Sequence, residues 1–470
     1  MRLYFITALN LALQMPTKHS LMSALSVKNN QKSYKNEKTT LEIDGDTALN
    51  LPKNLEFVEF SKETLILAPE RGNFIACFNK EQLEIFKNLQ QDSINEVEKK
   101  AKNKDDFNFI VGQILDREFF EIPLKLSDEY DTAQVYLTNA CNLACPHCYM
   151  NSRVANKNEL SLEEWLSVID SLKKCDIREI IFSGGEILLN KDYFKIIKYA
   201  KELGFIIRLK SNGTLWSADK IREIANFIDD IQISLDGINE EMNSKIRGNG
   251  SFEKALFTIK EFSKCGVKVI VATTPTYKNL KEIESSFVEF AKNLLKECEN
   301  LRFIVSQKML GGRGISMKFD EAAKEYAKIT DSIMDKLYPN YKLKNLSIDI
   351  ERKERVRNCG YGGLSISSDG GIYLCNRIDE LAPIANIKQD FLEIIKRARE
   401  FNKKSSVDFV EPCKNCGVRY ICGGGCRIDE YNFKGDFRLV DSKLRKDCSE
   451  EKALRFKQNL LGGLKYIYGF

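Results

Sequence analysis

Apolar and polar residues alternate regularly between residues 133 and 309. Short apolar runs typical of buried strands are each followed by a segment whose apolar residues recur every three or four positions, as in an amphipathic helix. The strand-like runs cover residues 133–139, 179–185, 205–213, 230–237, 267–276 and 301–309. The helix-like segments between and after them cover residues 161–175, 191–204, 217–227, 251–266 and 278–295. This order predicts parallel βα units over residues 132–340, with a site at the C-terminal ends of the strands.

Several helix boundaries in this region carry their own signals. Ser161 and Glu164 have the spacing of a capping box, in which each side chain bonds to the other residue's backbone. Gly204 and Gly266 stand where two helices should stop, because glycine adopts the left-handed backbone that ends a helix. These signals agree with the periodicity and strengthen the α/β prediction.

The chain before residue 45 lacks the pattern of a packed domain. Residues 3–15 are apolar enough to resemble a signal-peptide core, but they are too short to span a membrane. An export or membrane-surface role, an amphipathic extension and an upstream start codon all remain open for them. Residues 26–42 are rich in Lys, Asn and Ser, which predicts a flexible linker. We therefore expect residues 1–45 to form an extension and linker.

Two further regions flank the βα repeat. From residue 50 to 128, two alternating runs at 55–61 and 64–69 precede helix-period segments, which predicts a small β-then-α module. From residue 345 to 470 the chain becomes rich in Cys, Gly and turn residues, as expected of a metal-organised domain.

Composition narrows the class of protein. With 470 residues, 43% of them hydrophobic and 30% charged, two or three soluble domains are expected. The net charge of +5 is too small to indicate nucleic-acid binding, and no later stretch reaches the length of a membrane span, so we expect a cytoplasmic protein. The two histidines, His19 and His147, leave little material for His-based zinc catalysis or catalytic triads. Any difficult chemistry should therefore belong to a cofactor.

Cysteine spacing indicates what that cofactor is. Of 14 cysteines, three crowd into one loop as Cys141, Cys145 and Cys148. An iron–sulfur cube normally takes four thiolates, so a loop with three can hold three irons and leave the fourth open for a ligand. A zinc knuckle that borrows a fourth cysteine, and three unrelated core cysteines, are the alternatives.

This loop, with His147 just before its third cysteine and a strand before its first, resembles the signature of the radical SAM superfamily. The resemblance implies a partial (β/α)6 barrel. It also implies that the unique iron of a [4Fe–4S] cluster chelates the amino and carboxylate groups of S-adenosylmethionine. One electron then cleaves the sulfonium and yields a 5′-deoxyadenosyl radical, which takes a hydrogen atom from the substrate.

The motif at the end of the second strand-like run is similar to the family's methionine-binding motif. Gly184, Gly185 and Glu186 match the residues that hold the methionine amino group, and the glycines should allow the backbone to approach the ligand closely. Ile187 stands where the family usually has proline. Such a motif alone is more often an ordinary turn, so it counts only together with the cysteine loop.

The next strands carry further family-like residues. Ser211 and Asn212 resemble a ribose-contacting pair, and Ser234 and Asp236 are candidate neighbours of the cofactor. Arg247 is placed to meet the methionine carboxylate. The resemblance therefore implies one S-adenosylmethionine site built from the ends of several strands.

A second group of cysteines lies near the C-terminus. It comprises Cys359, Cys375, Cys413, Cys416, Cys422, Cys426 and Cys448. CxxC pairs alone would suggest a zinc ribbon. The whole string resembles the SPASM domain of radical SAM peptide-modifying enzymes, which implies two auxiliary [4Fe–4S] clusters and three clusters in all.

The resemblance divides these cysteines between the auxiliary clusters. One would be bound by Cys413, Cys416, Cys422 and Cys448. The other would be bound by Cys359, Cys375 and Cys426, with either an outside ligand or an open iron. Cys298 is the best outside candidate, although it is expected, like Cys77, Cys175 and Cys265, to be a small buried apolar residue.

Two features favour peptide maturation among SPASM chemistries. Asn376 follows Cys375 where sulfatase maturases have a proposed aspartate base, and an amide cannot accept that proton. The 50–128 module resembles, in its β-then-winged-helix order, the element by which maturases bind a leader peptide as an added strand. The implied partners are a precursor peptide with its leader and a reductase, flavodoxin or ferredoxin as electron donor.

An open auxiliary iron could hold a substrate cysteine, which makes a thioether crosslink the expected product. Carbon–carbon crosslinking and sulfatase-type protein maturation are the alternatives within the family. A zinc-organised binding protein without catalysis is the alternative outside it.

Overall fold

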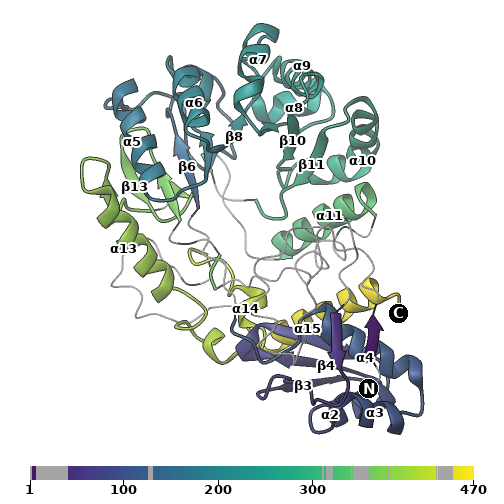
Figure 1. The fold of residues 1–470 in the computed structure, drawn as a ribbon. Helices are drawn as coiled ribbons and strands as arrows, with labels where there is room; N and C mark the ends of the chain where they lie inside the picture. Colours follow the sequence, from purple (N-terminus) through teal and green to yellow (C-terminus); the bar gives the residue numbers. More distant parts are fainter. Residues whose placement is uncertain are drawn as a thin grey trace.

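A nine-stranded, mostly parallel sheet forms the centre of the molecule (Figure 1). The computed structural model describes residues 3–6, 41–124, 131–309, 312–313, 321–339, 341, 357–359, 361, 363–378, 381–429, 431 and 448–470. The strand order is β11-β10-β9-β8-β7-β6-β12-β13-β14. No helix within these ranges is long and apolar enough to cross a membrane.

Six of these strands are the parallel strands predicted from the sequence. They are β6 (Thr132–Tyr136), β7 (Glu179–Ser183), β8 (Ile206–Ser211), β9 (Asp230–Ser234), β10 (Lys268–Thr273) and β11 (Leu301–Val305). The helices that follow them are α5 (Leu162–Lys174), α6 (Tyr193–Glu202), α7 (Ala218–Ile224), α8 (Glu240–Arg247), α9 (Ser251–Lys264), α10 (Leu280–Glu297) and α11 (Glu321–Leu337). Figure 1 shows these helices on the outside of the curved sheet. Helix α8 was not predicted.

Local sequence signals fixed the ends of the helices as expected. Ser161 and Glu164 form both bonds of a capping box at the start of α5. Gly204 and Gly266 follow α6 and α9 with φ angles of +83° and +77°. The strands bury one set of alternating residues against the helices, such as Ile207 and Leu209 of β8, and turn the other set toward the barrel interior.

The cysteine-rich region continues the barrel sheet. Strand β12 (Leu364–Ile366) pairs in parallel with β6, and β13 (Gly371–Tyr373) and β14 (Ala385–Asn386) add antiparallel strands beyond it. Its helices are α13 (Phe391–Lys404), α14 (Arg419–Cys422) and α15 (Glu450–Tyr468). This region thus holds more regular structure than its turn-rich sequence predicted.

The N-terminal module consists of three strands followed by three helices. These are β3 (Glu56–Phe60), β4 (Glu63–Ala68), β5 (Asn73–Cys77), α2 (Lys80–Leu89), α3 (Ile94–Lys100) and α4 (Lys104–Asp116). The sequence predicted the β-then-α order but missed β5. One face of this antiparallel sheet packs against the module's own helices. The winged-helix likeness stays a prediction.

Helix α15 covers the opposite face of this small sheet. Leu460, Leu461 and Leu464 share a buried cluster with Leu65 and Phe74 of the sheet. Ion pairs join the same surfaces, among them Lys465 with Glu63 at 2.5 Å. The C-terminal helix and the N-terminal module therefore share a hydrophobic core, although the residues of the barrel lie between them in the sequence.

Near the N-terminus, β1 (Leu3–Ile6) pairs antiparallel with β2 (Leu41–Asp44). The predicted linker at 26–42 lies outside the described residues except for its last two positions, which belong to β2.

Candidate functional site

The cysteine loop follows β6 at the C-terminal edge of the barrel sheet. Burial raises the pKa of the Cys141 thiol, and the neighbouring Glu186, Cys145 and Cys148 raise it further. The fold therefore brings the three thiols close together, as the spacing predicted. Arg247 lies near Cys145 and lowers the pKa of that thiol, which burial otherwise raises. A cation beside these sulfurs favours their ionised, metal-binding form.

The two glycines after β7 lie against the backbone that leads into this loop. The amide of Gly185 donates to the Thr138 carbonyl, and the amide of Glu186 donates to the Ala140 carbonyl, both at 2.8 Å. A Cβ on Gly184 would lie 2.5 Å from the Thr138 carbonyl oxygen, and one on Gly185 would lie 2.2 Å from that of Ala140. The sequence predicted that these glycines let the backbone approach a ligand closely. In the structure they let it approach the backbone of residues 138–140. Contact with the methionine amino group stays a prediction.

Replacing Gly185 by alanine should displace the cysteine loop. The new Cβ would clash with the Ala140 carbonyl, one residue before Cys141. We expect a loss of roughly 1–3 kcal/mol of stability, typical of overpacking, and a lower iron content after anaerobic reconstitution. Gly112→Ala is the matched control, because nothing lies within 4 Å of a Cβ there. Equal iron content and equal melting temperature for the two variants would contradict the prediction.

Glu186 is buried beneath the loop and accepts two hydrogen bonds from the end of β8. Ser211 Oγ donates to Oε1 at 2.8 Å, and the Asn212 amide donates to Oε2 at 2.7 Å. Burial raises the pKa of Glu186 to about 7 even though these bonds favour the carboxylate. Asn212 also reaches the loop, with Nδ2 at 3.9 Å from Cys141 Sγ and 2.9 Å from Asn142 Oδ1. Three of the predicted residues therefore form one network with the first cysteine.

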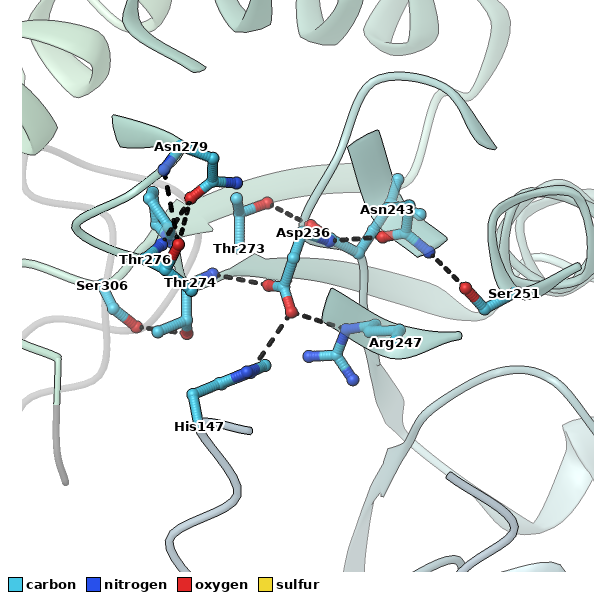
Figure 2. A network of polar contacts seen from close by, with 12 residues as sticks. His147, Asp236, Asn243, Arg247, Ser251, Thr273, Thr274, Thr276, Asn279 and Ser306 are labelled. Carbon is cyan, nitrogen blue, oxygen red and sulfur yellow. Dashed lines mark hydrogen bonds and ion pairs between the residues drawn. The ribbon is translucent and has the colours of Figure 1, made fainter. Parts of the chain in front are cut away.

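Asp236 anchors a second network (Figure 2). Its Oδ2 lies 3.2 Å from His147 Nε2 and 2.6 Å from Arg247 Nε, and its Oδ1 accepts from the Thr274 amide at 2.8 Å. Burial alone would raise the pKa of Asp236, but the Arg247 and His147 charges lower it to about 2. Both oxygens are engaged by protein groups, so Asp236 ties the cysteine loop to β9 and α8. Ser234 lies two residues earlier, at the end of β9.

Several residues of these networks were missed by the sequence analysis. Asn142 and Thr214 hydrogen-bond to each other, Trp216 Nε1 donates to Ser211 Oγ, and Asn243 Oδ1 accepts from the Asp236 amide. The Thr274 contact was missed as well. Asn142 lies within the cysteine loop, and Thr214 and Thr274 closely follow strand ends, which is a signal that the sequence offers. Trp216 and Asn243 lie farther from the strands, and Asn243 belongs to the unpredicted α8, so no such signal marked them.

The C-terminal cysteines gather in two sets within the described residues. Burial raises the pKa of Cys375 to about 11, and Cys359 and Cys426 act on the same thiol. Burial also raises the pKa of Cys416, with Cys422 and Cys413 beside it. The resemblance groups these same neighbours, and their division between two clusters stays a prediction. Cys448 immediately precedes α15, whose N-cap is Ser449.

The remaining cysteines behave as structural residues with one exception. Cys77, Cys175 and Cys298 are buried, as predicted. Cys265 is exposed, so its prediction was wrong, because it follows α9 on the solvent side of the helix end. Cys298 is 4% exposed in the barrel core, beside β11 at the far edge of the sheet from β12. That position favours packing over ligation.

Within the described ranges, no three His, Cys, Asp or Glu side chains lie close enough to hold a single metal ion. A cubane cluster is larger than an ion, and each of its irons takes one thiolate. Thiols that are too far apart to share one ion can therefore still bind different irons of the same cluster. At the first loop three thiols lie beside a buried arginine and two polar networks. This donor set fits a cluster with one iron left for a zwitterionic ligand.

Comparisons with known proteins agree with this geometry. The radical SAM superfamily model matches residues 135–294, and the SPASM model, an iron-sulfur cluster-binding domain, matches residues 358–417. The AdoMet-dependent heme synthase of Methanosarcina barkeri is 30% identical over 64% of this chain and 92% of its own length. The mycofactocin maturase MftC of Mycolicibacterium smegmatis is 27% identical over 63% of this chain and 77% of its own.

A solved structure shares the fold. The structure of anSMEcpe with bound AdoMet and the Cp18Cys peptide has a TM-score of 0.53 at 19% identity, and the match covers 72% of this chain and 99% of that one. Together, the cysteine loop, the parallel barrel and these matches place the chain in the radical SAM superfamily, as an enzyme that uses S-adenosylmethionine and iron–sulfur clusters and carries a SPASM domain.

Proposed function

We propose that this enzyme is a maturase of ribosomally made peptides. In this proposal the N-terminal module binds the leader of the precursor, and the barrel removes a hydrogen atom from a core residue. The resulting carbon is then joined to a cysteine sulfur as a thioether. The name of the maturase MftC supports a maturation reaction for a relative of this chain.

An open strand edge in the N-terminal module is the observation that carries the peptide proposal. Its opposite edge, at β5, is closed by α4. Gln113 donates to the Ala76 carbonyl at 2.8 Å and accepts from the Ala76 amide at 2.9 Å, while Arg117 donates to the Phe74 carbonyl. The Phe74 amide donates to Asn73 Oδ1. No backbone group on that edge is left for a partner strand.

The β3 edge differs. The backbone N–H and C=O groups of Phe74 and Ala76 in β5 point away from β4. Backbone hydrogen bonds alternate sides along each antiparallel strand, so the registers of β5 with β4 and of β4 with β3 leave the N–H and C=O groups of Phe57 and Glu59 pointing outward from β3. Among the described residues, no hydrogen-bond partner meets these four groups. The Phe57 ring is 40% exposed and packs against Phe86 of α2. An extended peptide could bond to this edge and place an apolar side chain beside Phe57.

The site residues then have assigned roles in the proposal. When bound, the first cluster and S-adenosylmethionine supply the radical that abstracts hydrogen. Its ligands are Cys141, Cys145 and Cys148. The S-adenosylmethionine pocket comprises Gly184, Gly185, Glu186, Ser211, Asn212, Ser234 and Arg247, with Asp236 holding Arg247 and His147 in place. Glu186 and Arg247 have opposite charges, which suits the ammonium and carboxylate of a methionine group.

Two auxiliary clusters complete the proposed set. The first would use Cys413, Cys416, Cys422 and Cys448. The second would use Cys359, Cys375 and Cys426, and its open position would bind the sulfur of a substrate cysteine, which favours a thioether over a carbon–carbon bond. A reductase, flavodoxin or ferredoxin would supply the electron.

A second candidate is a small-molecule reaction of the kind that the heme synthase of M. barkeri is named for, because that relative matches at 30% identity over 92% of its length. The match covers 64% of this chain, so a substantial part of it remains outside the comparison. A leader-binding module would give that part a role.

The test first searches the neighbouring reading frames for a short cysteine-containing peptide and then uses that peptide as the substrate. Under nitrogen, with S-adenosylmethionine and dithionite, we expect the peptide to lose two hydrogen atoms and to resist thiol alkylation, because a thioether consumes a thiol. A product that still alkylates indicates a carbon–carbon bond. No change in the peptide, with conversion of a porphyrin substrate instead, would overturn the proposal.

A variant of the open edge tests the binding step separately. Proline at position 59 removes an outward N–H that makes no bond within the sheet, so Glu59→Pro should fold and still release 5′-deoxyadenosine. Its affinity for the peptide should fall about 5- to 10-fold, the loss of one net hydrogen bond. Unchanged affinity would place the leader elsewhere.

A further inference from the structure

The barrel interior holds a buried lysine, Lys210, that no carboxylate of the described residues pairs with. Arg208 and Lys210 both face the interior from β8. Arg208 is paired with Glu179 at 3.0 Å and Asp230 at 3.1 Å. Within the described ranges, no carboxylate lies within ion-pair distance of Lys210, whose Nζ donates to Gln134 Oε1 at 3.4 Å. Burial lowers the pKa of this amine.

Lys210 begins a chain of polar groups between the two cysteine regions. Gln134 Nε2 donates to the Tyr136 hydroxyl at 2.7 Å, and that hydroxyl donates to the Asn376 carbonyl at 2.5 Å. The Tyr149 hydroxyl interacts with the same tyrosine. Tyr149 directly follows Cys148, and Asn376 directly follows Cys375. Tyr149 and Tyr136 thus connect the first cysteine loop with the auxiliary cysteines, and Lys210 is linked to this connection through Gln134.

The proposed reaction must release a proton inside the barrel, between the first cysteine loop and the auxiliary cysteines. Hydrogen abstraction converts a peptide C–H bond into a carbon radical and leaves 5′-deoxyadenosine. Formation of the new carbon–sulfur bond breaks the S–H bond of the cysteine, and releases one proton and one electron. The electron passes to an oxidised auxiliary iron–sulfur cluster. Asn376 cannot take the proton, because an amide is not a base at neutral pH.

Other groups facing this space are poor acceptors. Burial raises the pKa of Tyr136 and of Tyr149, so both stay protonated. Asp236 is held as a carboxylate by the Arg247 guanidinium, and its Oδ2 also contacts His147. Glu186 accepts bonds from Ser211 and the Asn212 amide, and the proposed function sets its carboxylate against the methionine ammonium, so it is not available to the peptide cysteine.

We propose that the Lys210 amine accepts the proton released when the new bond forms. This inference rests on the proposed function. Lysine suits the task because a desolvated amine loses its proton readily, whereas a guanidinium remains protonated at any physiological pH. The interior position without a carboxylate is what distinguishes Lys210 from the paired Arg208.

The test compares Lys210→Arg and Lys210→Met with the wild-type enzyme in D₂O under nitrogen, with S-adenosylmethionine, dithionite and the peptide identified in the test of the proposed function. We expect both variants to release 5′-deoxyadenosine within about twofold of wild type. Crosslinked product per 5′-deoxyadenosine should fall about 10²-fold or more, the usual contribution of a general base. The carbon radical that is not crosslinked should then take one electron from dithionite and one deuteron from the solvent, so deuterium should accumulate in uncrosslinked peptide.

The controls separate the possible failures. Lys254→Arg, at an exposed position of α9, should behave as wild type. If Lys210→Arg restores crosslinking while Lys210→Met does not, the lysine is a structural cation and the base proposal is overturned. If both variants crosslink as well as wild type, Lys210 has no role. If wild type itself leaves the peptide unchanged, the proposed function fails, and this inference fails with it.

Discussion

Replacing Cys145 by alanine should abolish the release of 5′-deoxyadenosine. Cys145 is the middle cysteine of the first loop, and its thiol lies beside Arg247 and near Cys148. Without it the loop offers two thiolates, too few to hold the cluster that would cleave the sulfonium. The loss should exceed the roughly 10–100-fold typical of changes to groups that merely orient metal ligands. Anaerobic reconstitution with dithionite, followed by chromatography of the nucleoside, measures it.

Matched cysteine variants make this result specific. Cys265→Ala changes an exposed cysteine outside both groups and should leave 5′-deoxyadenosine release and iron content unchanged. Cys375→Ala should keep the release of 5′-deoxyadenosine but lose one auxiliary cluster, so its iron content should fall by about four of roughly twelve. Release that survives in Cys145→Ala, or disappears in Cys265→Ala, would refute the assignment of the loop.

The sequence predicted the barrel well because its strands bury one continuous apolar face, and their helices carry strong caps. It missed β5, since all five residues from Asn73 to Cys77 are buried and show no alternation. It missed α8 for the opposite reason: Glu240–Arg247 is mostly polar and buries only Met242, Asn243 and Ile246. Periodicity needs several apolar residues set against polar ones: β5 does not alternate, and α8 has only Met242 and Ile246 as apolar residues.

The candidate site was predictable as a set of residues but not as a set of contacts. Motif spacing identified Glu186, Asp236 and Arg247, yet it could not show that Asp236 holds His147 and Arg247. Such a contact joins a loop, a strand end and a helix end, and it depends on how the barrel closes. The role of Gly185 was also hidden, because the atom it approaches belongs to Ala140. The Asp236 contacts and the approach of Gly185 to Ala140 both depend on packing between segments that are distant in the sequence.

The Asp236 network gives the second large effect that we expect. Asp236→Asn should lower the free energy of unfolding by about 3–5 kcal/mol near pH 7, because it leaves the buried Arg247 guanidinium without a counter-charge. It should also loosen the cysteine loop, since His147 loses its partner. Urea unfolding followed by the fluorescence of Trp165 and Trp216, both buried in the barrel, measures the change.

Two comparisons and a pH series decide whether charge is the cause. Asp219→Asn breaks an exposed ion pair with Arg222 and should change nothing measurable. Adding Arg247→Met to Asp236→Asn should recover part of the loss, because the unpaired cation is then gone. The folded pKa of Asp236 is about 2, below its unfolded value, so its contribution is complete above about pH 4 and disappears as the pH falls toward 2. The difference in the free energy of unfolding between wild type and Asp236→Asn should therefore be constant from pH 5 to 8 and shrink below pH 4. A difference that instead grows on acidification would exclude this electrostatic account.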